Sequence, residues 1–284
     1  MYLCCAERCF STQPNDMMHN EILMLGTGNA LVTRCYNTCF LLRSRSGAQL
    51  MVDAGGGNGI LAQLERSGTD RTKISHLFVT HAHTDHILGV VWMMRMALQH
   101  QVPCPLHLYS HRKVLDTLQA ICQLILPSKQ TARIGSVVLF HELRDGEAFQ
   151  VDDIGLQCFD IHSTKEPQFG FEAKLPGGLR LTCLGDEPYC EVNEKFAAGT
   201  DWLMSEAFCL YADRERFRPY EKHHSTALDA ARLADRLGAK GLILYHTEDK
   251  TLATRREAYT AEARTVFHGR ICVPDDLERI LLDN

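Results

Sequence analysis

Residues 80–86 read Thr80-His81-Ala82-His83-Thr84-Asp85-His86. They come directly after an apolar segment, residues 74–80, that is typical of a buried strand. The run contains three imidazoles and one carboxylate but no cysteine. Imidazole and carboxylate are ligands that zinc and similar divalent ions prefer, and a set without cysteine favours a reactive site over a closed structural one. The stretch therefore predicts a metal site at a strand end, in preference to a polar turn that contains histidines by chance.

The spacing within this stretch indicates how two ions share it. His81 and His83 are two positions apart, so at a strand end both side chains project to the same side and can bind one ion. Asp85 and His86 lie where the apolar run of residues 87–94 begins. From there they can reach a second ion beside the first.

Four later segments that read as strands end in groups suited to the same site. Residues 156–161 are followed by His162, residues 179–184 by Gly185 and Asp186, residues 202–205 by Glu206, and residues 242–245 by His246. Functional groups in α/β folds collect at strand ends, where a rigid sheet aims them. A single histidine after a strand is most often an ordinary polar residue, but together these groups predict one shared site.

The candidate ligands divide into a set for one ion, a set for a second ion and a bridging carboxylate: His81, His83 and His162; Asp85, His86 and His246; and Asp186. This arrangement leaves room for a water shared by two ions about 3.5–4 Å apart, which lower its pKa. Two divalent ions carry more charge than two carboxylates and a hydroxide. The pocket is therefore expected to be positive and to bind an anionic group such as a phosphodiester, although a neutral ester or lactone stays open.

Asp53 and an early glycine turn each allow two interpretations. Asp53 ends a strand ahead of a glycine run, where it either caps the next element or orients a metal-bound histidine. The turn Gly26-Thr27-Gly28 lacks the full dinucleotide-binding spacing and precedes a strand, so we interpret it as a tight turn rather than a phosphate loop.

The hydrophobic pattern predicts one α/β domain over residues 20–284, with sheets packed between helices, after an extension at residues 1–19. Expected strands are 22–25, 38–42, 49–53, 74–80, 105–109, 136–141, 156–162, 169–173, 179–184, 202–205 and 241–245, the first three of them antiparallel. Expected helices are 59–66, 87–101, 111–126, 189–198, 225–237 and 249–263.

Composition sets broad limits on partners and location. The chain of 284 residues has 45% hydrophobic and 23% charged residues and a formal net charge of -5, which gives no general signal for binding polyanions. We find no apolar run of about 20 residues that would cross a membrane and no secretion signal at the N-terminus. The twelve cysteines are scattered, which favours a reduced, cytoplasmic protein. Cys4, Cys5 and Cys9 form no C-x-x-C pair, and their role stays open.

The pattern H-x-H-x-D-H, followed by His162, Asp186 and His246, resembles that of the metallo-β-lactamase-fold hydrolases over nearly the whole chain from about residue 20. The resemblance implies a four-layer αβ/βα sandwich, in which two mixed sheets flanked by helices carry a dinuclear metal site between them. It also places the seven candidate ligands at the positions that the family uses. Two divalent ions are expected, with zinc first and manganese or iron as alternatives, because histidine and aspartate accept those ions too.

Three further segments resemble the ribonuclease Z subgroup, which cuts the 3′ trailer from precursor transfer RNA: Ser205-Glu206-Ala207-Phe208, residues 224–231 and Leu242-Ile243-Leu244-Tyr245-His246. This resemblance implies that Glu206 and His224 deliver a proton to the leaving oxygen, with Glu206 orienting His224. Asp85, Glu206 and His224 are the candidate catalytic residues. Without the resemblance, His224 reads as a residue at a helix start and Glu206 as part of a buried pair.

The chain departs from that subgroup between His162 and Asp186. Ribonuclease Z enzymes carry a long basic arm there, rich in glycine and proline, whereas residues 163–185 leave room for a hairpin only. The sequence therefore contains no arm that supports RNA as a partner. The acidic net charge does not support RNA either, because RNA affinity depends on neutralising backbone phosphates.

The sequence thus predicts a dinuclear zinc phosphodiesterase of ribonuclease Z-like type, in which a hydroxide shared by the ions attacks a small or accessible substrate. The alternative is an ester, lactone or aryl-sulfate hydrolase at the same site. A third reading is a metal-binding scaffold without turnover. No membrane contact is expected, and a homodimer is left open.

Overall fold

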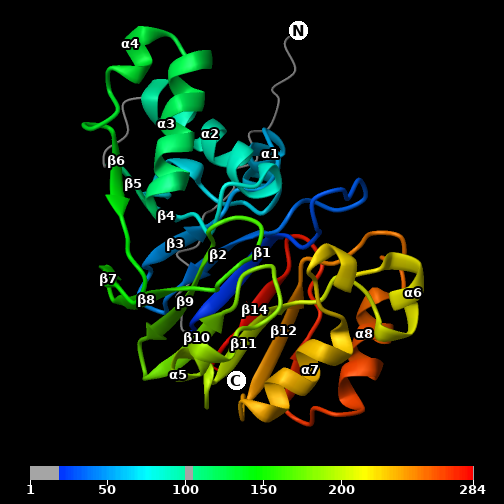
Figure 1. The fold of residues 1–284 in the computed structure, drawn as a ribbon. Coiled ribbons are helices and arrows are strands. Elements are labelled where there is room, and N and C mark those ends of the chain that lie inside the picture. Colours follow the sequence, from blue (N-terminus) through cyan, green and yellow to red (C-terminus); the bar gives the residue numbers. More distant parts are fainter. Residues whose placement is uncertain (1–18, 100–104, 284) are drawn as a thin grey trace, which may run out of the picture.

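Two seven-stranded mixed sheets form the centre of the computed structural model, which describes residues 19–99 and 105–283 (Figure 1). The first sheet has the order β14-β1-β2-β3-β4-β5-β6, with β1 (Glu21–Gly26), β2 (Cys39–Arg43), β3 (Gln49–Val52), β4 (His76–Phe78), β5 (Leu106–Ser110), β6 (Val138–Glu142) and β14 (Arg279–Leu281). The second has the order β13-β12-β11-β10-β9-β8-β7, with β7 (Ala148–Val151), β8 (Ile154–Asp160), β9 (Phe169–Leu175), β10 (Leu179–Cys183), β11 (Trp202–Glu206), β12 (Gly241–Tyr245) and β13 (Arg270–Cys272).

Each sheet changes from antiparallel to parallel pairing along its width. In the first sheet β14, β1, β2 and β3 pair antiparallel, whereas β3, β4, β5 and β6 pair parallel. In the second sheet β7, β8, β9 and β10 pair antiparallel, and β10, β11, β12 and β13 pair parallel. Both sheets are therefore mixed, and the first three strands have the predicted antiparallel arrangement.

Helices cover the outer faces of both sheets (Figure 1). The helices are α1 (Gly59–Arg66), α2 (Thr84–Gln99), α3 (Arg112–Ile125), α4 (Ser128–Thr131), α5 (Glu194–Ala197), α6 (Arg214–Phe217), α7 (Ala227–Arg236) and α8 (Arg255–Arg264), and short 3₁₀ turns are η1 (Arg71–Lys73), η2 (Glu191–Asn193), η3 (Tyr211–Asp213) and η4 (Tyr220–Lys222). Helices α1, α2 and α3 lie on the first sheet, and α7 and α8 lie on the second. The predicted four-layer sandwich is confirmed.

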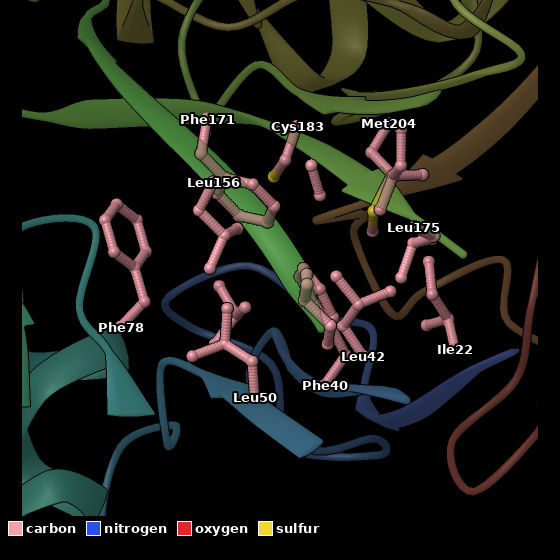
Figure 2. Close-up of a cluster of buried hydrophobic side chains, with 14 of the residues drawn as sticks. Ile22, Phe40, Leu42, Leu50, Phe78, Leu156, Phe171, Leu175, Cys183 and Met204 are labelled. Carbon is pink, nitrogen blue, oxygen red and sulfur yellow. The ribbon is translucent and has the colours of Figure 1, made fainter. Parts of the chain in front are cut away.

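Alternating side chains of the same strand enter different hydrophobic cores, which is why these strands read as continuous apolar runs. Ile22 and Met24 of β1 point into the core between the sheets, whereas Leu23 and Leu25 pack under the helices. In β12, Ile243 enters the central core and Leu242 packs against the outer helices. Figure 2 shows the central core, in which Phe40, Leu42 and Leu50 of the first sheet face Leu156, Phe171 and Met204 of the second.

The main differences from the expected elements lie at helix ends. Helix α2 begins at Thr84, so Asp85 and His86 lie in its first turn rather than ahead of it. Helix α8 begins at Arg255 rather than near residue 249, because the carboxylate of Asp249 accepts hydrogen bonds from the backbone of Thr33 and Arg34 in a distant loop. The helix expected at residues 189–198 is only the short pair η2 and α5. Strands β7, β13 and β14 and helices α4 and α6 were not predicted.

Two further predictions concern the limits of the fold. The extension at residues 1–19, which includes Cys4, Cys5 and Cys9, lies almost entirely outside the described residues, and the division into domains stays a prediction. Within residues 19–99 and 105–283, no helix combines the length and the apolar character needed to cross a membrane.

Close backbone contact fixes the start of α2 against the end of β3. The amide of Ala54 donates to the carbonyl of His86 (3.2 Å), and the amide of Gly89 donates to the carbonyl of Gly55 (2.8 Å). A methyl group at Gly89 would overlap the carbonyl of Ala54. The glycine is therefore what allows the helix that carries Asp85 and His86 to lie this close to the sheet.

We expect Gly89→Ala to lower the free energy of unfolding by about 1–3 kcal/mol, because backbone rather than a flexible side chain must move to accept the methyl. Bound metal should fall with it, since Asp85 and His86 move with α2. Urea unfolding and elemental analysis measure both effects. Gly57→Ala is the matched control, because a methyl there meets no neighbouring atom; equal unfolding midpoints for the two variants would contradict this role of Gly89.

Candidate metal centre

Imidazoles and carboxylates from distant parts of the chain meet at one end of the two sheets. His81 and His83 follow β4, Asp85 and His86 lie in the first turn of α2, Asp186 follows β10, and His246 directly follows β12. Parallel strands end at the same edge of a sheet, so residues that follow β10 and β12 are delivered to one place. All these residues except His83 are at most 5% exposed.

His81, His83 and Asp186 form a first group of ligand atoms within 4.8 Å of one another. Nε2 of His81 is 2.8 Å from Nδ1 of His83 and 3.5 Å from Oδ2 of Asp186. The hydroxyl of Thr80 is 2.9 Å from the other ring nitrogen of His81, which leaves Nε2 to face the group. This is the set that the sequence assigned to one ion, without His162.

Asp85, His86 and His246 form a second group, whose ligand atoms also lie within 4.8 Å of one another. Nε2 of His86 is 3.4 Å from Oδ2 of Asp85, and Nε2 of His246 is 3.6 Å from it. Both nitrogens are also 3.5 Å from Oδ2 of Asp186. A single carboxylate oxygen of Asp186 is thus shared between the two groups, which is the arrangement of a bridging ligand.

The charge and the unpaired atoms of this centre suit cations. Burial by itself raises the pKa of Asp186, but the imidazoles of His81, His86 and His246 outweigh it and hold that pKa well below its ordinary value. Among the described residues, Nε2 of His86 and Nε2 of His246 are buried without a hydrogen-bond partner. Ionised carboxylates and unpaired imidazole nitrogens are the donor set of zinc and similar ions, so the residues present fit a metal.

The structure favours one of the two interpretations of Asp53. Its carboxylate accepts hydrogen bonds from the backbone and the hydroxyl of Thr80, each at 2.8 Å, and lies 2.7 Å from Nδ1 of His86. Asp53 is 3% exposed and adopts a left-handed backbone with φ of 53°. It therefore orients His86 and the residue before His81 rather than capping a helix.

The side chain of His162 does not join either group. It lies two residues after β8, is exposed and has a left-handed φ of 59°, and its backbone amide donates to the carboxylate of Asp160 (2.7 Å). The structure brings together six of the seven predicted ligands. A ligand role for His162 requires its side chain to turn toward Asp186, and this role stays a prediction.

Glu206 and His224 lie beside the second group. Glu206 ends β11 and is 1% exposed; its Oε2 is 3.5 Å from Nδ1 of His224, and its other oxygen accepts from the amide of Ser225. The ring of His224 lies 5.3 Å from that of His246 and stacks on Phe208 at 5.0 Å. Burial opposes protonation of His224, but the facing carboxylate of Glu206 raises its pKa above the ordinary value. The neighbouring His223 is exposed.

A cavity of about 260 Å³ adjoins His224, and sequence reasoning did not find it. Its walls include Leu31, Phe208, Phe217, Lys222 and Lys250. These residues come from three separate chain segments, and the ammonium of Lys222 lies 4.8 Å above the ring of Phe208. No local pattern signals such a cavity, because only the folded chain places the loops together.

The chain is similar to known proteins over most of its length. The ribonuclease Z of Mycobacterium marinum is 25% identical over 92% of this chain and 98% of its own length. The metallo-β-lactamase fold protein YhfI from Bacillus subtilis superimposes with a TM-score of 0.73 at 18% identity, covering 92% of this chain and 98% of that protein. The short form of human tRNase Z superimposes with a TM-score of 0.72 at 21% identity, over 93% of this chain and all of that protein, 100%.

These similarities confirm the predicted resemblance to the metallo-β-lactamase-fold hydrolases and to their ribonuclease Z-like branch. A family profile described as Anti-Pycsar protein Apyc1 matches residues 20–262, which include every candidate site residue. That span is most of the sequence. The chain therefore belongs to the Anti-Pycsar protein Apyc1 family.

Proposed function

We propose that the protein is a metal-dependent phosphodiesterase whose centre binds two divalent ions, with zinc as the first choice. The observation that carries the proposal is the shared Oδ2 of Asp186, 3.5 Å from imidazole nitrogens of both groups. His81 and His83 would hold one ion and Asp85, His86 and His246 the other, with Asp186 between them and His162 completing the first set. Manganese and iron suit the same donors.

When bound, two ions supply an activated water and positive charge that stabilises the phosphoryl oxygens. The chain itself supplies the proton for the leaving oxygen. Nδ1 of His224 faces Glu206, so Nε2 is the nitrogen left to hold a proton toward the substrate. Glu206 keeps His224 in this orientation and favours its protonated form, which is the form that a general acid needs.

The surroundings of the centre favour a small or accessible phosphodiester. Two of the similar proteins are named ribonuclease Z and tRNase Z, and these names indicate that they act on RNA. In this chain, however, the only strands between His162 and Asp186 are those of the hairpin of β9 and β10. The partly apolar cavity beside His224 can take the organic group of such a substrate. We therefore do not propose a large RNA as the substrate, and a homodimer stays a prediction.

The cysteines of the described residues are free thiols, and most of them are buried. Burial raises the pKa of Cys158 and Cys209 to about 12, so these thiols stay protonated and unreactive at neutral pH. These thiols are compatible with a reducing environment, and we propose the cytoplasm as the location.

Replacing His224 tests the proposed chemistry. His224→Ala should lower turnover of bis-p-nitrophenyl phosphate by about 10²–10⁴ and leave bound metal unchanged, because the variant loses only the proton donor. His223→Ala, at the exposed neighbouring position, is the matched control and should retain turnover. Equal turnover of the two variants would remove His224 from the mechanism.

A substrate panel separates the phosphodiesterase from the ester, lactone or aryl-sulfate hydrolase and from a scaffold without turnover. We expect the phosphodiester to have the highest kcat/KM, because a positive centre stabilises an anionic transition state best. A p-nitrophenyl carboxylic ester and an aryl sulfate are assayed beside it with the same metal-loaded protein. A carboxylic ester or sulfate hydrolysed faster would reject the phosphodiesterase, and hydrolysis of none would favour the scaffold.

Removing the charge of Asp53 tests how His86 is held. Asp53→Asn should weaken metal binding by about 10–100-fold, because the amide orients His86 less well than a carboxylate does. Competition with a chelator measures this change. Asp116→Asn, on the exposed face of α3, is the control and should bind metal as the unchanged protein does. Equal chelator resistance in both variants would show that Asp53 has no such role.

A further inference from the structure

Gln168 lies where the chain segments that deliver three candidate ligands meet. Its backbone carbonyl accepts from the amide of Ile161, the residue before His162, at 3.0 Å. The amide of the next residue, Phe169, donates to the carbonyl of Thr80, the residue before His81, at 3.0 Å. The backbone around Gln168 therefore joins two ligand-bearing strand ends.

The side chain of Gln168 lies against a third such strand end. A methyl group at Gly185, the residue before Asp186, would come within 2.8 Å of Nε2 of Gln168. Gly185 also has a left-handed φ of 85°, which favours glycine at this position. Because Gly185 has no side chain, the amide of Gln168 can lie against its backbone, one residue before Asp186.

Two complementary polar atoms are left unpaired at this place. Nε2 of Gln168 is a hydrogen-bond donor, Oδ1 of Asp186 is an acceptor, and neither has a hydrogen-bond partner among the described residues. Gln168 is 1% exposed and Asp186 is 4% exposed. A buried donor or acceptor without a partner destabilises the folded protein, so a structure that pairs these two atoms is favoured.

Gln168 and Asp186 line the same small cavity. Its volume is about 10 Å³, close to what one water needs, and Gln168, Gly185 and Asp186 form part of its wall. Asp53 and Thr80 line it too, and the rest of its wall is mostly apolar.

We propose that Gln168 is a positioning residue that holds Asp186 through one buried water, which accepts from Nε2 of Gln168 and donates to Oδ1 of Asp186. With Oδ1 engaged by this water, the carboxylate presents only Oδ2 to the two groups of ligands and keeps a fixed orientation between them. Gln168 thus acts on the bridging carboxylate and does not touch the substrate. The inference rests on the metal centre proposed above, but not on the choice of a phosphodiester as substrate.

Gln168→Leu tests this role, because leucine keeps most of the volume and removes the donor. Holoprotein variants are titrated with a chelator, and the cobalt-substituted proteins are compared by visible absorption. We expect the variant to lose its metal at a chelator concentration about 10–100-fold lower than the unchanged protein does. We also expect the absorption bands of its cobalt form to shift. Gln157→Leu on β8, whose side chain donates to the carbonyl of Gly146 (2.9 Å) away from the centre, should change neither.

The outcomes separate this role from simple packing and from the metal centre itself. Unchanged chelator resistance and an unchanged cobalt spectrum in a folded Gln168→Leu variant would overturn the proposal. If that variant does not fold, Gln168→Met, which is flexible and also lacks the donor, is measured with the same two expected results. A crystal of the unchanged protein should contain a water bonded to both side chains, and its absence at high resolution would also overturn the proposal. Failure of the unchanged protein to bind any ion would overturn the metal centre.

Discussion

The buried carboxylate of Asp186 is the constraint on which the rest of the site depends. One of its oxygens lies 3.5 Å from a nitrogen of each of three imidazoles, which arrive from the end of β4, the start of α2 and the end of β12. Burying such charge and so many imidazoles is costly unless they are paired or coordinate cations. Proteins keep such groups together mainly where they serve a reaction, because structural cores are more stable without them.

The sandwich supplies the rigidity that this centre needs. Three separate hydrophobic cores fix the two sheets and their helices, so strand ends cannot shift independently. Polar contacts then set individual side chains: Asp53 orients His86, Glu206 faces His224, and the glycine at Gly89 lets α2 lie close to β3. The hydrophobic cores and these individual contacts are both required, since a displacement of about 1 Å is enough to impair a catalytic site.

The sequence could predict those features that are local or repeat along the chain. The H-x-H-x-D-H stretch indicates its ligands because they lie within six residues, and Asp186 and His246 follow because they end apolar strands. The direction of the His162 side chain was not predictable, since it depends on a left-handed backbone and on Asp160. The start of α8 and the cavity beside Gln168 likewise depend on contacts between distant segments. Contacts between distant segments leave no pattern in the local sequence, so only the folded structure reveals these features.

Anomalous diffraction from crystals of the purified protein, recorded at the zinc edge without added metal, tests the central claim most directly. We expect two peaks about 3.5–4 Å apart, one among His81, His83 and Asp186 and the other among Asp85, His86 and His246, with Oδ2 of Asp186 between them. A manganese or iron signal in the same two positions would change the metal but keep the centre. Well-ordered crystals in which no ion lies against Asp186 would contradict the account.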